Sequence, residues 1–420
     1  MEHAAANIAP GVHLMAKPAG PICNLDCGYC FYLEKENLFP SRNRFLMSDD
    51  VLRNYVAQNI KHEPGPEVVF TWQGGEPLLR GLEFYRRAVA YQRELANGKR
   101  IRNALQTNGV LLDEQWCAFL AESGFMVGIS LDGPREIHDA ARVDKQGRPT
   151  FDAVMKGIAL LKKYQIEFNV LVTVSRRVCE HPKDVYRFLK QHGLTHVQFN
   201  PVVERTAQGE EKGLGLTFAQ PGKRSLPTSQ VDVSPHSVEP EAYGDFLIAI
   251  FDEWVRNDVG RIYVMNFEWA LVSFLGLPAT VCLFAENCGR ALVLEHNGDI
   301  YSCDHFVYPE YRLGNIQETE LSALADSARQ QAFGTAKSAD LPDYCRRCEV
   351  RFACHGECPK NRFAITPDGQ PGLNYLCPGY KRYFSHISKY MTAMARLISL
   401  GQPASLIMQA IKGPLAVSLA

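Results

Sequence analysis

The sequence lacks an excess of charge of either sign. Its 45 Lys and Arg residues nearly balance its 46 Asp and Glu residues, which leaves a formal net charge of -1. Proteins whose main partner is DNA, RNA or anionic lipid carry a basic surface that attracts phosphate groups. The composition therefore argues against nucleic acid or a membrane surface as the main partner.

Long hydrophobic runs are also missing. The longest uncharged run, from Trp269 to Ala285, is interrupted by Pro278 and falls short of the roughly 20 apolar residues that a membrane-spanning helix needs. The N-terminal stretch MEHAAANIAPGVH has neither the basic nor the apolar region of an export signal. We therefore expect no membrane segment and a cytoplasmic location.

Cysteine, in contrast, is plentiful, with 13 in the chain. Without an export signal, so many thiols indicate metal or redox chemistry rather than disulfide bonds. Only Cys117 and Cys179 stand apart from the two groups that the others form, and Cys117 has the pattern of a small core residue on an amphipathic helix. The first group is Cys23, Cys27 and Cys30, and the second is Cys282, Cys288, Cys303, Cys345, Cys348, Cys354, Cys358 and Cys377.

Short apolar runs alternate with helical periodicity from about residue 10 to residue 200. The predicted strands are VHLMAK, EVVFTWQ, IRNALQT, FMVGISL, IEFNVLVTV and HVQFN, and the helices between them include 48–60, 81–96, 113–123, 151–164 and 182–192. Six β-then-α units predict an α/β fold with a parallel sheet, either doubly wound or a partial barrel. In both cases the site lies at the carboxyl ends of the strands, where the first cysteine group follows the first strand.

The second half of the chain has a different pattern. Residues 204–240 are rich in Gly, Pro, Ser and charge without a sustained period, which predicts a long surface loop, a linker or a mobile lid. Helices are predicted at 241–257, 318–333 and 374–398, and Asn297-Gly298 predicts a hairpin turn. We expect domains at 1–203 and 241–400, with 204–240 as an insertion and 401–420 as a tail.

The first cysteine group has the spacing C-x3-C-x2-C, and three thiolates are one short of a full ligand set. A [4Fe–4S] cluster normally takes four cysteines, so three leave one iron open to a small chelating molecule such as S-adenosylmethionine. A zinc site completed by a distant residue is the alternative. The spacing, followed by an aromatic residue in CGYCFY, resembles the radical SAM superfamily, which implies a partial (βα)6 barrel.

The resemblance extends to motifs that follow the second, third and fourth strands. They are QGGEP at 73–77, LQTNG at 105–109 and SLDG at 130–133. In such enzymes the backbone of the glycine motif accepts the amino group of the methionine moiety, which implies a cofactor site at Gly74, Gly75 and Glu76. Ser130, Asp132 and Arg142 match positions that hold the carboxylate and the ribose, for which the planar fork of Arg142 is suited.

The second cysteine group resembles a SPASM domain, the extension of radical SAM enzymes that modify peptides and proteins. This resemblance implies two auxiliary [4Fe–4S] clusters with interleaved ligands, and so three clusters in all. One cluster would be held by Cys282, Cys288, Cys303 and Cys358, and the other by Cys345, Cys348, Cys354 and Cys377. Taken alone, the C-x2-C spacing would also suit zinc ribbons.

Within the SPASM group the chain most resembles the anaerobic sulfatase-maturating enzymes, through FTWQGGEPLLRGLEFY, GISLDGPREIHD, IYSCDHFV and YRLGNI. These enzymes oxidise an active-site Cys or Ser of a sulfatase, in a Cys/Ser-x-Pro-x-Arg type of motif, to Cα-formylglycine. The resemblance implies that Asp304 is the general base and that Tyr32 and Gln73 lie near the substrate or cofactor. It also implies a low-potential electron donor such as flavodoxin or ferredoxin.

Three alternatives remain at this point. A SPASM enzyme can instead cross-link a peptide, build a thioether or make a peptide-derived cofactor. A zinc-stabilised interaction module would have no catalytic activity. An RNA-modifying radical enzyme is disfavoured by the neutral charge. For Asp304 the alternative is a turn aspartate that closes a hairpin, and His138 and His305 are expected to be structural.

Overall fold

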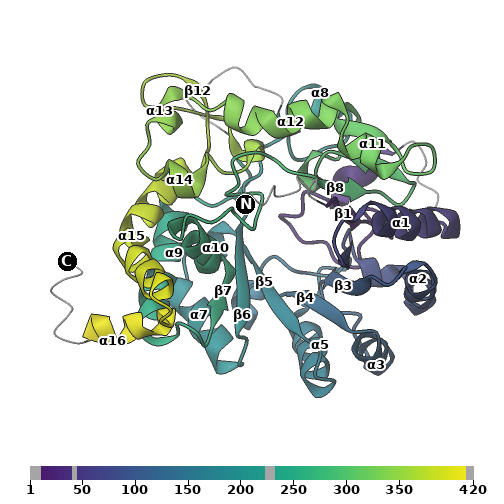
Figure 1. The fold of residues 1–420 in the computed structure, drawn as a ribbon, viewed down its shortest axis with the longest axis horizontal. Helices are drawn as coiled ribbons and strands as arrows, with labels where there is room; N and C mark the ends of the chain where they lie inside the picture. Colours follow the sequence, from purple (N-terminus) through teal and green to yellow (C-terminus); the bar gives the residue numbers. More distant parts are fainter. Residues whose placement is uncertain (1–10, 40–44, 223–231, 413–420) are drawn as a thin grey trace, which may run out of the picture.

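The computed structural model describes residues 11–39, 45–222 and 232–412. Their main sheet begins with β1 (His13–Ala16), β2 (Glu67–Trp72), β3 (Arg100–Thr107), β4 (Phe125–Ser130), β5 (Phe168–Val174) and β6 (His196–Pro201). These strands are parallel and lie side by side in chain order. A doubly wound sheet would reverse its order at a switch point, so the partial barrel is the correct one of the two predicted architectures (Figure 1).

The predicted helices follow their strands and cover the outside of the sheet (Figure 1). They are α1 (Asp49–His62), α2 (Leu82–Leu95), α3 (Glu114–Glu122), α5 (Phe151–Lys163) and α7 (Pro182–Gln191). The Ser48 side chain accepts a hydrogen bond from the Val51 backbone N–H at the start of α1. Such a cap satisfies one of the free donors of the first turn and ends the preceding loop at a defined residue.

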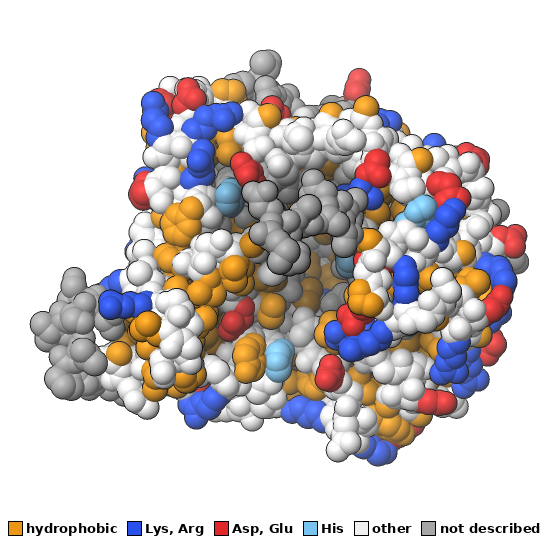
Figure 2. Space-filling view, in the orientation of Figure 1, with side chains coloured by type: hydrophobic (Ala, Val, Ile, Leu, Met, Phe, Trp, Pro, Cys, Tyr) orange, Lys and Arg blue, Asp and Glu red, His pale blue; other side chains and the backbone are white. Residues whose placement is uncertain are grey.

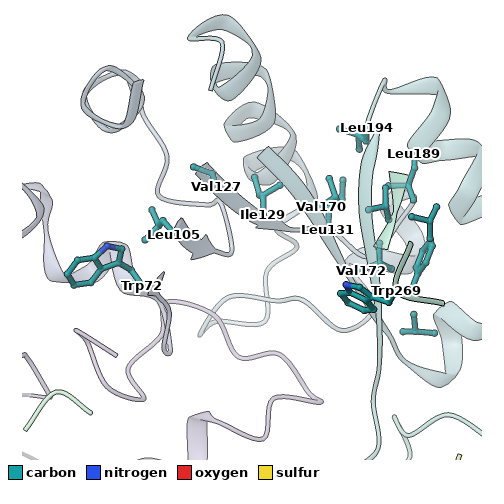
Figure 3. Packing of buried hydrophobic residues seen from close by; sticks show 14 of the residues in the cluster. Trp72, Leu105, Val127, Ile129, Leu131, Val170, Val172, Leu189, Leu194 and Trp269 are labelled. Carbon is teal, nitrogen blue, oxygen red and sulfur yellow. The ribbon is translucent and has the colours of Figure 1, made fainter. Parts of the chain in front are cut away.

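The core lies between this sheet and its helices. Figure 3 shows Trp72, Leu105, Val127, Ile129 and Val170 from successive strands, all at most 1% exposed. The strands are apolar because both of their faces are covered, as is usual for parallel sheets. Cys117 is fully buried in the same core, as its position on an amphipathic helix predicts.

Four further strands extend the sheet at its two edges. β7 (Tyr263–Val264) pairs with β6, while β8 (Ala291–Leu294) pairs in parallel with β1 and continues into β9 (Asp299–Tyr301) and β10 (Arg312–Asn315). The hairpin at Asn297-Gly298 is confirmed, and Gly298 supplies the positive φ of 91° that its turn requires. The pairing of β8 with β1 was not predicted, and it brings the segment around Cys303 to the first cysteine group.

The remaining helices lie mostly in the second half of the chain. They are α4 (Arg135–His138), α6 (Arg176–Cys179), α8 (Glu210–Gly213), α9 (Pro240–Asn257), α10 (Met265–Phe274), α11 (Leu321–Ala325), α12 (Ala328–Ala339), α13 (Asp343–Arg346), α14 (Arg351–Cys354), α15 (Cys377–Ser399) and α16 (Ile407–Lys412). The single helix predicted at 318–333 is wrong: Ser327 accepts a hydrogen bond from the Gln330 N–H and starts a new helix there.

Short elements complete the description. The 3-10 helices are η1 (Leu33–Leu38), η2 (Pro77–Arg80), η3 (Asp304–Phe306), η4 (Pro309–Tyr311), η5 (Pro359–Asn361) and η6 (Ala404–Leu406), and a small hairpin joins β11 (Ala364–Ile365) to β12 (Pro371–Leu373). Among the described helices, none is both long and apolar enough to cross a membrane.

The segment 204–240 is a packed loop rather than a linker where the structure describes it. Arg205 pairs with Val233 and Thr206 with Phe218 through isolated β-bridges. Leu216 and Val238 are buried. The stretch 223–231, which carries much of the predicted lid, lies outside the described residues, so that role stays a prediction.

Helices α9 and α15 cross where two glycines meet, and this contact yields a test of the packing. A methyl group on Gly379 would run into the carbonyl oxygen of Pro240, a backbone atom that cannot rotate away. We expect Gly379→Ala to destabilise the protein by about 1–3 kcal/mol, the usual range for overpacking, measured as a lower thermal midpoint. Gly213→Ala is the control, because nothing lies within 4 Å of its added Cβ. Equal midpoints for the two variants would contradict the packing.

Candidate active site

The loop that carries the first cysteine group is held by the backbone that follows β2. The Gly75 N–H donates to the Gly20 carbonyl at 2.8 Å, and the Glu76 N–H donates to the Ile22 carbonyl at 2.8 Å. A Cβ at position 75 would collide with the carbonyl oxygen of Ile22, so only glycine permits this approach. The glycine motif therefore positions the chain directly before Cys23.

Glu76 connects this loop to the end of β3. Its fully buried carboxylate accepts hydrogen bonds from the Leu78 N–H at 3.0 Å, the Thr107 hydroxyl at 2.8 Å and the Asn108 N–H at 2.9 Å. Burial raises the pKa of Glu76 to about 7, although these donors oppose the shift. The carboxylate is thus engaged within the protein, and a direct contact with the cofactor stays a prediction.

Asp132 and Arg142 form a buried ion pair at the ends of β4 and β5. Arg142 Nε donates to Asp132 Oδ2 at 2.9 Å, and the Tyr29 hydroxyl donates to the same oxygen at 2.5 Å. Asp132 Oδ1 accepts from the Thr173 N–H at 2.9 Å. Since Tyr29 lies between Cys27 and Cys30, the pair anchors the cysteine loop from the side opposite Glu76. Contacts of Asp132 and Arg142 with the carboxylate or ribose of a cofactor stay predictions.

Two further predicted residues lie on the same face. The Ser130 hydroxyl, at the end of β4, accepts a hydrogen bond from Gln106 Nε2 at 3.3 Å. Gln73 directly follows β2, and its N–H donates to the Ala16 carbonyl at 2.9 Å. Both residues are only partly buried at the carboxyl ends of the strands, where a ligand can reach them.

The thiols of the first group suit an iron–sulfur cluster. Burial raises the pKa of Cys23 and of Cys27 to about 12, and the nearby Arg142 only partly offsets this for Cys27. Thiols with such pKa values are protonated at neutral pH unless a metal binds them as thiolates. Asn108 Nδ2 lies 3.6 Å from Cys23 Sγ, so it can donate to this sulfur, as donors around cluster sulfurs do.

Asp304 lies beside the end of β1. Its carboxylate forms an ion pair with Lys17, with 2.6 Å between Oδ1 and Nζ, and Lys17 is 2% exposed directly after β1. Burial acts to raise the pKa of Asp304, but the positive charge of Lys17 and smaller contributions hold it below its ordinary value. The residue is therefore a carboxylate at neutral pH, and it begins η3 rather than closing the 297–298 turn.

Tyr32 contacts both Glu295 and Lys17. Its hydroxyl donates to the fully buried Glu295 at the end of β8, and Lys17 Nζ lies 4.4 Å from the centroid of its ring. Tyr32 is thereby placed beside the Lys17–Asp304 pair, 5% exposed. Whether it contacts substrate or cofactor stays a prediction, but its location agrees with that role.

His138 and His305 differ in their hydrogen bonding. His138 Nδ1 accepts from the Asp132 N–H at 3.3 Å, and its Nε2 contacts the Thr150 hydroxyl at 3.1 Å, which is the expected structural role. His305 has no hydrogen-bond partner for Nδ1 among the described residues, and its ring lies 5.3 Å from that of Phe31. Burial lowers the pKa of each to about 4, so both rings are neutral.

The positions of the second cysteine group agree with the two predicted sets. Burial raises the pKa of Cys303, and the nearby Cys282 and Cys288 raise it further. Burial is also the largest cause of the raised pKa of Cys358. Glu357 and the nearby Cys303 and Cys288 raise this pKa further. Cys345, Cys348, Cys354 and Cys377 together line one small cavity. The proximities agree with the interleaved sets, and cluster ligation by each set stays a prediction.

Several charged residues of the site were not predicted. Lys17 directly follows an apolar strand, and this position in the sequence could have indicated its burial. Its partner Asp304, however, lies 287 residues away in the sequence. Lys35 is fully buried, with Nζ 3.2 Å from the centroid of the Tyr308 ring, and burial lowers its pKa to about 7. Lys360 forms a buried ion pair with Glu204. Nothing in the local sequence around these two lysines indicates their burial.

Comparisons with known protein families agree with this geometry. Residues 18–198 match the model of the radical SAM superfamily, and residues 282–349 match an iron–sulfur cluster-binding domain, SPASM. A serine-type anaerobic sulfatase-maturating enzyme from Bacteroides thetaiotaomicron is 45% identical over 407 residues, which covers 97% of each chain. A cysteine-type enzyme from Clostridium perfringens is 33% identical over 395 residues, which covers 93% of this chain and 98% of that one.

A solved structure has the same fold. Native anSMEcpe with bound AdoMet and the Cp18Cys peptide superposes with a TM-score of 0.79 at 31% identity, covering 93% of this chain and 100% of that one. The predicted combination of a partial radical SAM barrel with a SPASM region is thereby confirmed.

The hydrogen bonds of Glu76 yield a second test. In Glu76→Gln one oxygen becomes an NH2 group, which cannot accept from the N–H of Asn108 or of Leu78. An unsatisfied buried donor costs about 1–3 kcal/mol, so we expect a lower thermal midpoint even though the variant removes a buried charge. Glu122→Gln, at an exposed position on α3, is the matched control. A midpoint for Glu76→Gln at or above that of the unmodified protein would refute the structural role.

Proposed function

Since this chain belongs to the anaerobic sulfatase-maturating enzymes of the radical SAM superfamily, we propose that its target residue is a serine. The activity of the family is the oxidation of an active-site Cys or Ser of a sulfatase to Cα-formylglycine, and this chain is such an oxidase. The observation that carries the proposal is the 45% identity to a serine-type enzyme against 33% to a cysteine-type enzyme, both over nearly the whole chain.

The cofactors are S-adenosylmethionine and three [4Fe–4S] clusters, which supply radical formation and electron transfer when bound. We assign the S-adenosylmethionine-binding cluster to Cys23, Cys27 and Cys30. The auxiliary clusters are assigned to the sets Cys282, Cys288, Cys303, Cys358 and Cys345, Cys348, Cys354, Cys377. The proximities of the cysteines within each set support these assignments.

Asp304 is the proposed general base for the hydroxyl proton of the target serine. It is a partly buried carboxylate at neutral pH, and its ion pair with Lys17 restrains its orientation. A base has to reach the proton it removes within about 3 Å, directly or through one water. Loss of a hydrogen atom from Cβ makes the attached hydroxyl far more acidic, so a carboxylate of low pKa is sufficient for this step.

The partners follow from the same activity. The substrate is a polypeptide, and we propose that it carries the Ser-x-Pro-x-Arg form of the sulfatase motif. A low-potential donor such as flavodoxin or ferredoxin is proposed to supply electrons. We also propose a cytoplasmic location, because none of the 13 cysteines forms a disulfide and a cysteine-rich chain without disulfides is typical of a reducing compartment. Membership in the family removes the zinc-module and RNA-modifying alternatives.

An anaerobic peptide assay tests the choice of serine. The reconstituted enzyme is incubated with S-adenosylmethionine, a reductant and a peptide carrying either Ser-x-Pro-x-Arg or Cys-x-Pro-x-Arg. We expect a larger kcat/KM for aldehyde formation from the serine peptide, measured by mass spectrometry with 5′-deoxyadenosine in parallel. Faster oxidation of the cysteine peptide would overturn the serine proposal and leave the family activity intact.

A cysteine variant tests the assignment of the first cluster in the same assay. A variant with Cys23, Cys27 and Cys30 all replaced by Ala should form no 5′-deoxyadenosine from either peptide. It should still retain the iron of the two auxiliary clusters, because their proposed ligands are unchanged. Residual 5′-deoxyadenosine formation would contradict the assignment of these three cysteines.

Asp304→Asn tests the base. We expect aldehyde formation to fall about 10²–10⁴-fold, the usual contribution of a general base, whereas 5′-deoxyadenosine formation falls much less. The two rates are measured in one reaction, so their ratio reports uncoupling. Asp326→Asn is the matched control, since Asp326 pairs with Arg290 at an exposed position. If both rates fell equally in Asp304→Asn, the residue would not be the base.

A further inference from the structure

Charges of both signs are mixed on the face of the molecule shown in Figure 2, where Lys and Arg side chains lie beside Asp and Glu side chains. The described residues of this face therefore offer no large patch of one sign to a charged partner. The contacts that reach beyond the residues assigned so far are internal. They join the segment 204–240 to the first cysteine group.

The last part of this segment, residues 232–239, has a fixed course beside the chain that follows β6, and we call it the return segment. The Ser234 N–H donates to the Glu204 carbonyl at 2.8 Å, and Ser237 Oγ accepts from the Glu204 N–H at 2.9 Å. Ser234 and Ser237 are at most 3% exposed. Buried hydrogen bonds of this kind restrain the backbone between the two serines.

His236 lies between these anchors and reaches the first cysteine group. Its carbonyl accepts a hydrogen bond from the Arg176 N–H at 2.9 Å. A Cβ placed on Gly28 would lie 2.7 Å from His236 Nε2 and 3.2 Å from Cε1, so the imidazole lies directly against Gly28. The imidazole also meets the ring of Tyr29 edge to face, with centroids 6.2 Å apart. His236 thus covers the two middle residues of the sequence CGYC.

The barrel restrains the same turn through its backbone. The Gly28 N–H donates to the Ala141 carbonyl at 3.2 Å, and the Cys30 N–H donates to the Cys27 carbonyl at 3.0 Å. Gly28 directly follows Cys27, so a shift of Gly28 would move both cysteines. Contacts from the barrel and from the return segment together restrain this shift.

The first part of the segment 204–240 contacts the chain shortly after Cys30. The Glu34 carboxylate, on η1, accepts a hydrogen bond from the Thr217 N–H at 2.6 Å and from the Phe218 N–H at 3.1 Å. The segment therefore contacts the cysteine loop on both sides of Cys30. This arrangement holds the loop from outside the barrel.

We propose that His236 is a positioning residue for the cluster that binds S-adenosylmethionine, because its ring holds the turn from Cys27 to Cys30 in place. The proposal rests on the proposed function, since it takes these cysteines as ligands of that cluster. Residues behind the ligands of a metal orient those ligands, and their loss typically costs about 10–100-fold in metal affinity or activity. A cluster with three protein ligands is attached at fewer points than one with four, so the backbone around each ligand has a larger effect on its position.

Binding of S-adenosylmethionine tests the role of His236 without peptide or turnover. The reconstituted His236→Ala variant and the unmodified enzyme are dialysed to equilibrium against labelled S-adenosylmethionine, in the absence of a reductant. We expect the Kd of His236→Ala to be about tenfold higher, the lower end of the usual effect of such residues. The thermal midpoint and the iron of the auxiliary clusters should stay unchanged, which distinguishes positioning of the first cluster from general stabilisation.

Two further histidine variants make the result specific. His236→Phe should restore most of the affinity, because a phenyl ring can fill the same space against Gly28 and Tyr29. His196→Ala is the matched control, since His196 is exposed at the start of β6 and stacks on Tyr263 with centroids 4.9 Å apart. Its Kd for S-adenosylmethionine should equal that of the unmodified enzyme.

Gly28→Ala tests the same contact from its other side. The three atoms nearest to the added methyl group all belong to His236, and the φ of Gly28 lies outside the left-handed region, so the imidazole is the main obstacle to this change. We expect Gly28→Ala to push the ring aside and to raise the Kd as His236→Ala does. In the double variant the ring is absent, so the Kd should not exceed that of His236→Ala. Non-additivity of this kind identifies a direct contact.

The outcomes decide the proposal. An unchanged Kd in His236→Ala with the first cluster present would overturn it, as would a raised Kd together with a lowered thermal midpoint and lost auxiliary iron. It would also be wrong if His236→Phe bound as weakly as His236→Ala, or if the effects of the double variant were additive. Loss of the first cluster alone would support it. Failure of the proposed cluster assignment would show separately, as 5′-deoxyadenosine formation by the triple cysteine variant.

Discussion

The backbone of residues 74–76 packs directly against the turn that leads into the first cysteine group, and the site is built outward from this contact. No Cβ fits at Gly75, because the Ile22 carbonyl occupies that space. Glu76 then reaches the end of β3, and Asn108 at that end lies against Cys23. Direct contacts therefore join the ends of β2 and β3 to the cysteine loop.

Buried charges tie these segments to the rest of the molecule. An unpaired buried charge is strongly unfavourable, so each one has to be placed beside its partner. Asp132 with Arg142 links the cysteine loop to β4 and β5 through Tyr29, while Lys17 with Asp304 links β1 to the loop after β9. The parallel pairing of β8 with β1 places that loop, because β9 pairs with β8 and Asp304 follows β9 at the start of η3. The barrel and the cysteine-rich region are thus joined by a continuous sheet as well as by ion pairs.

Local sequence patterns predicted the strands and turns that interactions between neighbouring residues determine. The six parallel strands and the hairpin at Asn297-Gly298 follow from periodicity and turn chemistry, and the cysteine spacing predicted both clustered regions. What the sequence did not indicate depends on residues far apart in the chain. The β1–β8 pairing, the partner of Lys17 and the burial of Lys35 arise from contacts between segments that no periodic pattern connects. The break at Ser327 was missed for a different reason, because a serine inside a helical pattern can either continue the helix or cap a new one.

In the segment YSCDHF the proposed base directly follows a proposed cluster ligand, and this order bears on the proposed reaction. Oxidation of a serine Cβ to an aldehyde removes a hydrogen atom, a proton and an electron, and the last two have to leave from the same carbon–oxygen unit. Asp304, the proposed proton acceptor, directly follows Cys303, a proposed ligand of the cluster that would accept the electron. Adjacent positions in the chain keep the two proposed acceptors close to each other. Lys17 holds Asp304 from the barrel side, where the radical is formed. In the proposed mechanism a single peptide unit would link the proton acceptor to a ligand of the cluster that accepts the electron, and the ion pair with Lys17 joins that unit to the end of β1.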